Sequence, residues 1–294
     1  LLDHEDPDYG NGHGTHVTGT IAAVDNMEGV IGTAPNATIY ALKLFVWDYR
    51  EVVAAINWAV NCGIRIISMS FSIETDKEEL RAACDNAYAN GVLLFAASGN
   101  QNGSVRYPAK YDSVIAVGAV DEDGQRWVDP PEGSNYGPEL EFVAPGVDIY
   151  STWLNGGYAN KTGTSQACPH VAATAALVWS SKVDPDYDYD EDGIWSNFEV
   201  REKLKHLALD LGPPGRDDEY GYGLINAWAT NQRPLGDINI DYVVDGDDIF
   251  IVNRAYGSCP GHPNWNPVAD INIDNVVDGD DLFYITSHYG EADL

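Results

Sequence analysis

Two stretches of the chain hold residues that could act together as a nucleophile and a base. His13 lies in NGHGTHVTGTIAA at 11–23, and Ser165 lies in GTSQACPHVAA at 163–173. A serine hydroxyl attacks a carbonyl carbon only when a nearby imidazole takes its proton, and that imidazole needs a carboxylate to orient it. The pair therefore predicts a nucleophilic hydrolase whose third member, the carboxylate, has still to be found.

A third stretch, ASGN at 97–100, adds a candidate for stabilising negative charge. Residues 165–179 are almost wholly apolar and rich in Ala, which predicts a buried helix with Ser165 in its first turn. The free N–H groups and the dipole there favour a developing oxyanion. Asn100 follows an apolar strand-like run, at the edge where α/β sheets place their ligands, so its amide could face the same oxyanion. Singly, each of these stretches is more often structural; their joint order favours catalysis.

The elements that must position these residues alternate along the chain. Strand-like runs at 37–45, 64–70, 92–98 and 113–120 are interleaved with amphipathic helical runs at 50–61 and 76–90. Such alternation predicts βαβ units and a parallel sheet. Asp76 followed by Glu79 resembles a capping box for the second helix, and Gly91 follows its end. A further amphipathic helix is expected at 197–208.

The charge balance limits the partners. The 46 acidic and 16 basic residues give a formal net charge of −30, which argues against nucleic acid and anionic membranes and favours calcium or a salty medium. No run in the sequence has the length of a membrane span, and no signal peptide is visible. The four cysteines are widely spaced, without a C-x-x-C pair, and are expected to be buried or free thiols.

The C-terminal part contains an internal duplication with the ligand spacing of a calcium loop. DINIDYVVDGDD at 237–248 and DINIDNVVDGDD at 270–281 place oxygen donors at loop positions 1, 3, 5, 7, 9 and 12. The sixth position, which normally needs Gly, holds Tyr242 or Asn275. The predicted Ca2+ ligands, with the two valines acting through their carbonyls, are Asp237, Asn239, Asp241, Val243, Asp245, Asp248, Asp270, Asn272, Asp274, Val276, Asp278 and Asp281.

One more acidic segment, DPDYDYDEDG at 184–193, also spaces its acids by two. A third calcium site is one interpretation of this spacing. We expect a solvated insertion loop instead.

The chain resembles the subtilisin-like serine proteases over roughly residues 10–230. HGTHVTG, LKLF, INWAV, ISMSFS, FAASGN, VAPG, GTSQACPHVA and YGYGLINA follow that family's order and spacing. The resemblance implies a three-layer α/β/α fold with a mostly parallel sheet, and a secreted endopeptidase that acts through an acyl-enzyme. It implies His13 as general base, Ser165 as nucleophile, and Asn100 with the Ser165 N–H as the oxyanion hole. The substrate cleft it implies is lined by Ser70, Phe71, Ser72, Ala97, Ser98 and Gly99.

The chain departs from the family pattern at the catalytic acid. The family carries its Asp on a strand well upstream of the His, whereas only twelve residues precede His13 here. Asp3, Asp6 and Asp8 stand in a loop-like context and are poor substitutes. We therefore expect the Asp-bearing strand to lie upstream of Leu1 and residues 1–294 alone to be inactive. The stretch after LKLF is shorter than usual, and Cys168, where the family often has Ser or Thr, is expected to be a packing residue.

The duplicated loops resemble a dockerin domain, a small helical EF-hand-like unit. The resemblance implies calcium-dependent folding and docking to a cohesin-like partner, although a purely structural calcium clip is the alternative. The expected organisation is a peptidase domain at 1–230, a short linker at 231–235 and a dockerin-like domain at 236–294. The competing hypothesis for the whole chain is an inactive subtilisin-like scaffold attached to a surface assembly. An acid on the missing strand would favour the enzyme.

Overall fold

The computed structural model describes residues 12–44, 48–227, 238, 244, 246–266, 269–271, 276–287 and 289. Asp3, Asp6 and Asp8 lie outside these residues. So do seven of the twelve predicted calcium ligands: Asp237, Asn239, Asp241, Val243, Asp245, Asn272 and Asp274.

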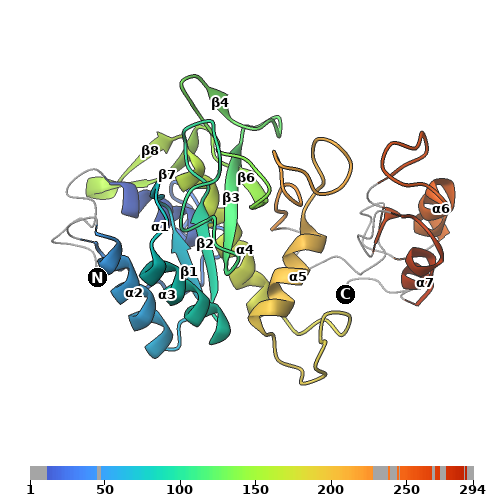
Figure 1. Cartoon of the computed structure of the whole chain (residues 1–294), viewed down its shortest axis with the longest axis horizontal. Helices are drawn as coiled ribbons and strands as arrows, with labels where there is room; N and C mark the ends of the chain where they lie inside the picture. The colour runs from blue at the N-terminus through green and yellow to red at the C-terminus, as the bar shows by residue number, and fades with distance from the viewer. Residues whose placement is uncertain are drawn as a thin grey trace.

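A four-stranded parallel sheet forms the centre of the larger part of the chain (Figure 1). Its order is β1 (Ile66–Met69), β2 (Leu93–Ala97), β3 (Val114–Val120) and β6 (Leu140–Pro145). Every residue of β2 and β3 is buried, as expected for parallel strands covered on both faces. The predicted strands at 64–70, 92–98 and 113–120 are confirmed.

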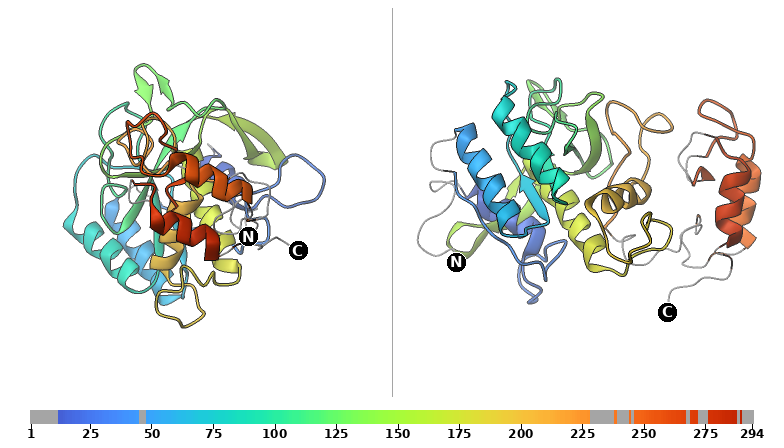
Figure 2. Two further views of the ribbon diagram at one scale, coloured as in Figure 1. Left: turned by 90° about the vertical axis from the view of Figure 1, so that its right-hand side faces the viewer. Right: turned by 60° about the horizontal axis from the view of Figure 1, so that its bottom comes forward.

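Alternate residues of β2 face two separate hydrophobic cores. Leu94 and Ala96 pack with α2 (Tyr49–Asn61) and α3 (Glu78–Ala89), whereas Leu93, Phe95 and Ala97 pack with α4 (Thr164–Ser180) and α5 (Asn197–Leu207). α1 (His13–Ala22) lies against α4. Helices thus cover both faces of the sheet (Figures 1 and 2), and the predicted three-layer α/β/α architecture is confirmed.

Two antiparallel pairs stand beside this sheet. β4 (Val128–Asp129) pairs with β5 (Glu132–Gly133). β7 (Ile149–Trp153) pairs with β8 (Gly157–Lys161) across the 3-10 turn η1 (Leu154–Gly156), and β7 packs against α1. Further along the chain, α6 (Gly246–Ala255) and α7 (Gly279–Ser287) pack on each other around their own small core.

Two local predictions were wrong. The expected strand at 37–45 is not formed over residues 37–44. Among the described residues no strand pairs with this segment, and an extended segment without a hydrogen-bonding neighbour cannot join a sheet. The N-cap of α3 is Lys77, without a side-chain cap, and not Asp76. Asp76 instead accepts a hydrogen bond from the Tyr111 hydroxyl at 3.0 Å and pairs with Arg81.

The remaining helix predictions hold within one or two residues. Gly91 follows the end of α3 with φ +83°, the left-handed conformation that terminates many helices. α5 begins with a complete capping box between Ser196 and Glu199. All four cysteines are free thiols, and burial raises the pKa of Cys168, which is fully buried, to about 11. Among the described residues no helix is long and apolar enough to cross a bilayer.

Candidate active site

α1 presents His13 at its first residue and is held there by the β7–β8 hairpin. Ser151 Oγ donates to the His16 carbonyl at 2.8 Å, and Thr152 Oγ1 donates to the Thr15 carbonyl at 2.9 Å. Gly19 permits this approach, since a Cβ there would lie 2.5 Å from Ser151 Oγ. The start of α1 is therefore fixed by backbone contacts from a hairpin distant in sequence.

His16, the second histidine of the HGTH motif, is a structural residue. It is fully buried, and its Nε2–H donates to the carbonyls of Ile149 at 2.9 Å and Ala159 at 3.1 Å. Burial lowers its pKa, so the neutral ring is favoured. His16 thus joins the helix to both hairpin strands, whereas His13 lies half-buried at the helix start.

α4 presents Ser165 in its first turn, and a proline one turn later frees the Ser165 carbonyl. Pro169 has no N–H to give to residue 165, four positions earlier. Ser70 Oγ supplies that donor at 2.8 Å, and Ser165 Oγ donates in return to the Ser70 carbonyl at 3.0 Å. The two serines join the start of α4 to the segment that follows β1.

Asn100 lies beside the same helix start. Its Oδ1 accepts hydrogen bonds from Thr164 N at 3.0 Å and Thr164 Oγ1 at 2.7 Å. A Cβ on Gly163 would lie 3.0 Å from Asn100 Nδ2, so that amide nitrogen faces the turn before Ser165. Because Oδ1 is engaged, Asn100 presents a donor, as an oxyanion site requires.

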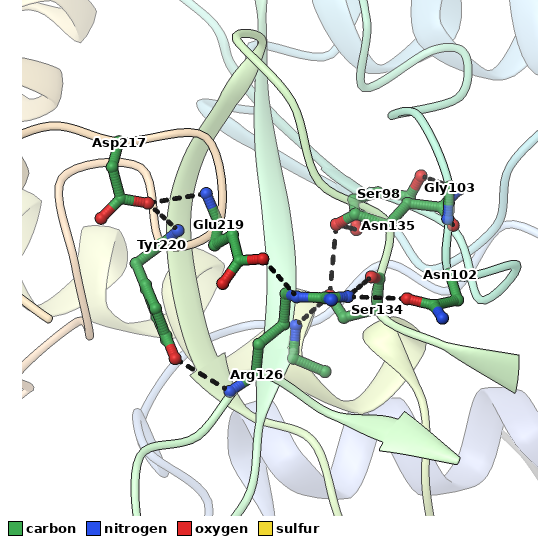
Figure 3. A network of polar contacts seen from close by, with 10 residues as sticks. Ser98, Asn102, Gly103, Arg126, Ser134, Asn135, Asp217, Glu219 and Tyr220 are labelled. Atoms are coloured by element: carbon green, nitrogen blue, oxygen red, sulfur yellow. Dashed lines mark hydrogen bonds and ion pairs between the residues drawn. The ribbon is translucent and has the colours of Figure 1, made fainter. Parts of the chain in front are cut away.

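The loop that carries Asn100 is held by Asn135, which lies beside Ser98 and Gly103 (Figure 3) and which the sequence did not single out. Asn135 is fully buried. Its Oδ1 accepts from Gln101 N at 2.8 Å and Gly103 N at 3.1 Å, and its Nδ2 donates to the Ser98 carbonyl at 3.1 Å. Nearby, Arg126 Nη1 donates to Asn102 Oδ1 at 3.0 Å and to the Ser134 carbonyl at 2.8 Å.

The predicted cleft residues differ in what they can offer a substrate. Ser70, Phe71 and Ser72 are half-buried, whereas Ala97, Ser98 and Gly99 are buried. The Ser98 hydroxyl donates to the Asn135 carbonyl at 3.1 Å, and its carbonyl accepts from Arg106 N at 3.0 Å. Ser98 therefore supports the loop from inside.

Comparison with known proteins identifies the family to which this chain belongs. A model of the subtilase family, Peptidase_S8, matches residues 2–223. The chain belongs to the subtilase family. This subtilase is 43% identical to Subtilisin DY of Bacillus licheniformis over 232 residues, 76% of this chain and 78% of that protein. It is 42% identical to Subtilisin BL of Lederbergia lenta over 228 residues, 76% and 78% of the two chains.

A longer relative matches this chain over a smaller share of its own length. The subtilase is 43% identical over 229 residues to the minor extracellular protease Epr of Bacillus subtilis (strain 168), which is 75% of this chain and 33% of that protein. The family is one of serine proteases, and hydrolysis of peptide bonds is the activity that these relatives support for the subtilase.

Proposed function

We propose that the protein is a serine endopeptidase in which Ser165 is the nucleophile, His13 the general base, and Asn100 Nδ2 with the Ser165 N–H the oxyanion hole. The observation that carries the proposal is the engagement of Asn100 Oδ1 by Thr164, which turns the amide donor toward the helix start that bears Ser165. A donor fixed in this way before substrate binds stabilises charge without reorganisation.

In the reaction, the Ser165 hydroxyl breaks its hydrogen bond to the Ser70 carbonyl, and Ser165 Oγ attacks the scissile carbonyl carbon while His13 takes the hydroxyl proton. The carbonyl oxygen becomes an oxyanion and accepts from Asn100 Nδ2 and the Ser165 N–H. His13 then protonates the leaving amine, and an acyl-enzyme remains on Ser165. Water, deprotonated by His13, attacks the ester and releases the acid. Ser70–Ser72 and Ala97–Gly99 form the two walls of the cleft, with Ser98 as an inward support.

The orienting acid is proposed to come from a strand carried outside residues 1–294. A groove of about 670 Å³ supports this. Residues 38–42, Ile64–Ile66 and Ser68 line it, together with residues of α1 and α4. β1 is an edge strand among the described residues, and Tyr40, 59% exposed, is one of the apolar side chains at the groove. A strand there would pair with β1 and give residues 37–44 their missing neighbour.

The C-terminal residues, 236–294, are proposed to form a calcium-dependent dockerin-like domain after a linker at 231–235. The described ligands are compatible with this role. Asp281 is fully buried, and its carboxylate accepts from Ile271 N at 2.6 Å and Asp278 N at 2.8 Å, so it closes the loop. In the first copy, Asp248 accepts from Ile238 N at 2.6 Å. Carboxylates held in this way suit Ca2+.

Two exposed aromatic residues support docking to a cohesin-like partner. Phe250 is 60% exposed and Phe283 is 68% exposed, and they occupy the same position in the two copies of the repeat. We propose that one or both contact the partner and that the peptidase works outside the cell on an assembly. Loss of calcium-dependent capture of a cohesin-like protein in Phe250→Ala/Phe283→Ala would support the docking role. Full capture by that variant would refute it.

The enzymatic proposal is tested with the full-length protein. A serine-reactive phosphonate should label Ser165 and abolish peptide hydrolysis, and Ser165→Ala should lower hydrolysis to background. Ser180→Ala, at the other end of the same helix, is the matched control and should retain full activity. Hydrolysis that persists in Ser165→Ala would refute the proposal. Hydrolysis by residues 1–294 alone would refute the external strand.

A further inference from the structure

The acidic segment before α5 gathers three carboxylates. Asp188, Asp190 and Asp192 each place a carboxylate oxygen within 4.8 Å of the other two. Such a group of negative charges is common on acidic surfaces, so its meaning depends on the residues that follow it.

Those residues complete a twelve-residue calcium-loop pattern. Counted from Asp188, acids occupy positions 1, 3 and 5, Gly193 occupies position 6, and Glu199 occupies position 12. Gly193 has φ +71°, the left-handed conformation that the sharp turn at position 6 requires. Ile194 brings its carbonyl to position 7. Unlike the two C-terminal repeats, this loop has both the Gly and the final Glu.

Glu199 is the independent observation that points to a cation. Its side chain comes from α5 and not from the acidic run, and the residue is only 2% exposed. Its Oε1 accepts from Tyr189 N at 2.9 Å and its Oε2 from Ser196 N at 2.8 Å, so the carboxylate faces into the loop. No ion pair among the described residues includes Glu199, and Lys203, one turn along α5, pairs with Asp184. The two N–H groups, one of them part of the capping box with Ser196, satisfy one lone pair on each oxygen, and a cation bound in the loop would balance the charge of this buried carboxylate beside the three others.

The same contacts recur in the two repeats. In all three loops the N–H at position 2 donates to the carboxylate at position 12, from Tyr189, Ile238 and Ile271 respectively. At position 9, Ser196 N donates to Glu199 as Asp278 N donates to Asp281. The helix that follows begins at position 10 in each case: α5 at Asn197, α6 at Gly246 and α7 at Gly279.

We propose that residues 188–199 form a calcium site within the subtilase domain. Carboxylates of Asp188, Asp190, Asp192 and Glu199 and the Ile194 carbonyl hold the ion, and the expectation of a merely solvated loop is replaced. The ion would fix the start of α5. That helix is tied to the rest of the domain by Asn197 Nδ2, which donates to the Tyr88 carbonyl at 2.8 Å, so calcium here stabilises the protease core.

The test compares two charge-neutral substitutions in one loop. Asp190→Asn removes a ligand at position 3, and Glu191→Gln removes the same charge at position 4, which bears no ligand; both residues are exposed. Equilibrium dialysis of the full chain should show one Ca2+ fewer for Asp190→Asn at a concentration that saturates the wild type, with at least tenfold weaker binding at that site. Glu191→Gln should keep the wild-type number.

Terbium gives a local readout of the same site. Trp195 stands at position 8 and is 5% exposed, so it should sensitise Tb3+ bound in the loop. The emission that Trp195→Phe abolishes should also be lost in Asp190→Asn and kept in Glu191→Gln. Equal calcium numbers and equal terbium emission in wild type, Asp190→Asn and Glu191→Gln would overturn the proposal.

Discussion

Removal of the Asn135 side chain is the most direct test of how the oxyanion loop is held. Asn135→Ala deletes the partners of three backbone groups, the N–H groups of Gln101 and Gly103 and the carbonyl of Ser98. Each such loss in a buried site costs about 1 kcal/mol or more, which gives about 3 kcal/mol in total. For a domain of this size that corresponds to a fall in Tm of about 6–12 °C.

The effect on activity should separate kcat from KM. A loop that has lost its support misplaces Asn100. Since the proposed role of Asn100 is to stabilise the oxyanion more than the bound substrate, kcat should fall more than KM rises. In Asn135→Asp, Oδ1 still accepts from Gln101 and Gly103, but an oxygen replaces the donor that faces the Ser98 carbonyl. We expect this variant to be destabilised as well.

The assay is thermal unfolding at saturating calcium, together with steady-state peptide hydrolysis by the full-length enzyme. Asn160→Ala, at an exposed position in β8, is the matched control and should melt with the wild type. If Asn135→Ala melts within about 2 °C of the wild type and keeps its kcat, the loop is held by other contacts and Asn135 is not its main support.

Three further results are expected. Arg201→Ala should lower the free energy of unfolding by about 3–5 kcal/mol, because the buried Glu141 carboxylate loses the two guanidinium N–H donors that bind it at 2.8 and 2.5 Å. In chemical denaturation, the double variant Arg201→Met/Glu141→Leu should be more stable than Arg201→Ala. A double variant less stable than Arg201→Ala would contradict this prediction. Burial lowers the pKa of three histidines, His16, His170 and His206. The unfolded chain therefore binds more protons than the folded chain below about pH 6.5, and the free energy of unfolding should fall as the pH drops from there. A free energy of unfolding that stays constant from pH 7 to 5 would contradict this prediction. Chelation of calcium should reduce the helical circular dichroism of the repeats at 236–294, and an unchanged spectrum would argue against calcium-dependent folding.

The elements with strong periodicity could be predicted from the sequence. The strands and helices between residues 49 and 120 lie where apolar runs and turn residues indicate, because each is specified by its own pattern. The segment at 37–44 fails for the opposite reason. Its apolar content favours a strand, but strand formation depends on a neighbour, and no local pattern reports whether that neighbour is present.

The candidate site divides in the same way. His13, Asn100 and Ser165 stand in short motifs and could be found from them. Asn135 could not, because its bonds reach residues 32 to 37 positions away and a lone Asn in a turn carries no signal. The same applies to Glu199, because it lies beyond the run of alternating acids at 184–193 and its burial depends on how α5 packs.

The contact between the β7–β8 hairpin and α1 limits which substitutions this protein tolerates at residues 151 and 152. The small hydroxyl side chains of Ser151 and Thr152 set the distance between the hairpin and α1, because each donates a hydrogen bond to a backbone carbonyl of the helix. At this distance Gly19 has no room for a side chain. A bulkier residue at either position would shift the helix that begins at His13, the proposed general base. A shift of about 1 Å at a reacting group can cost about a hundredfold in rate. Libraries aimed at new specificity should therefore hold 151 and 152 constant, as strictly as the residues that touch substrate.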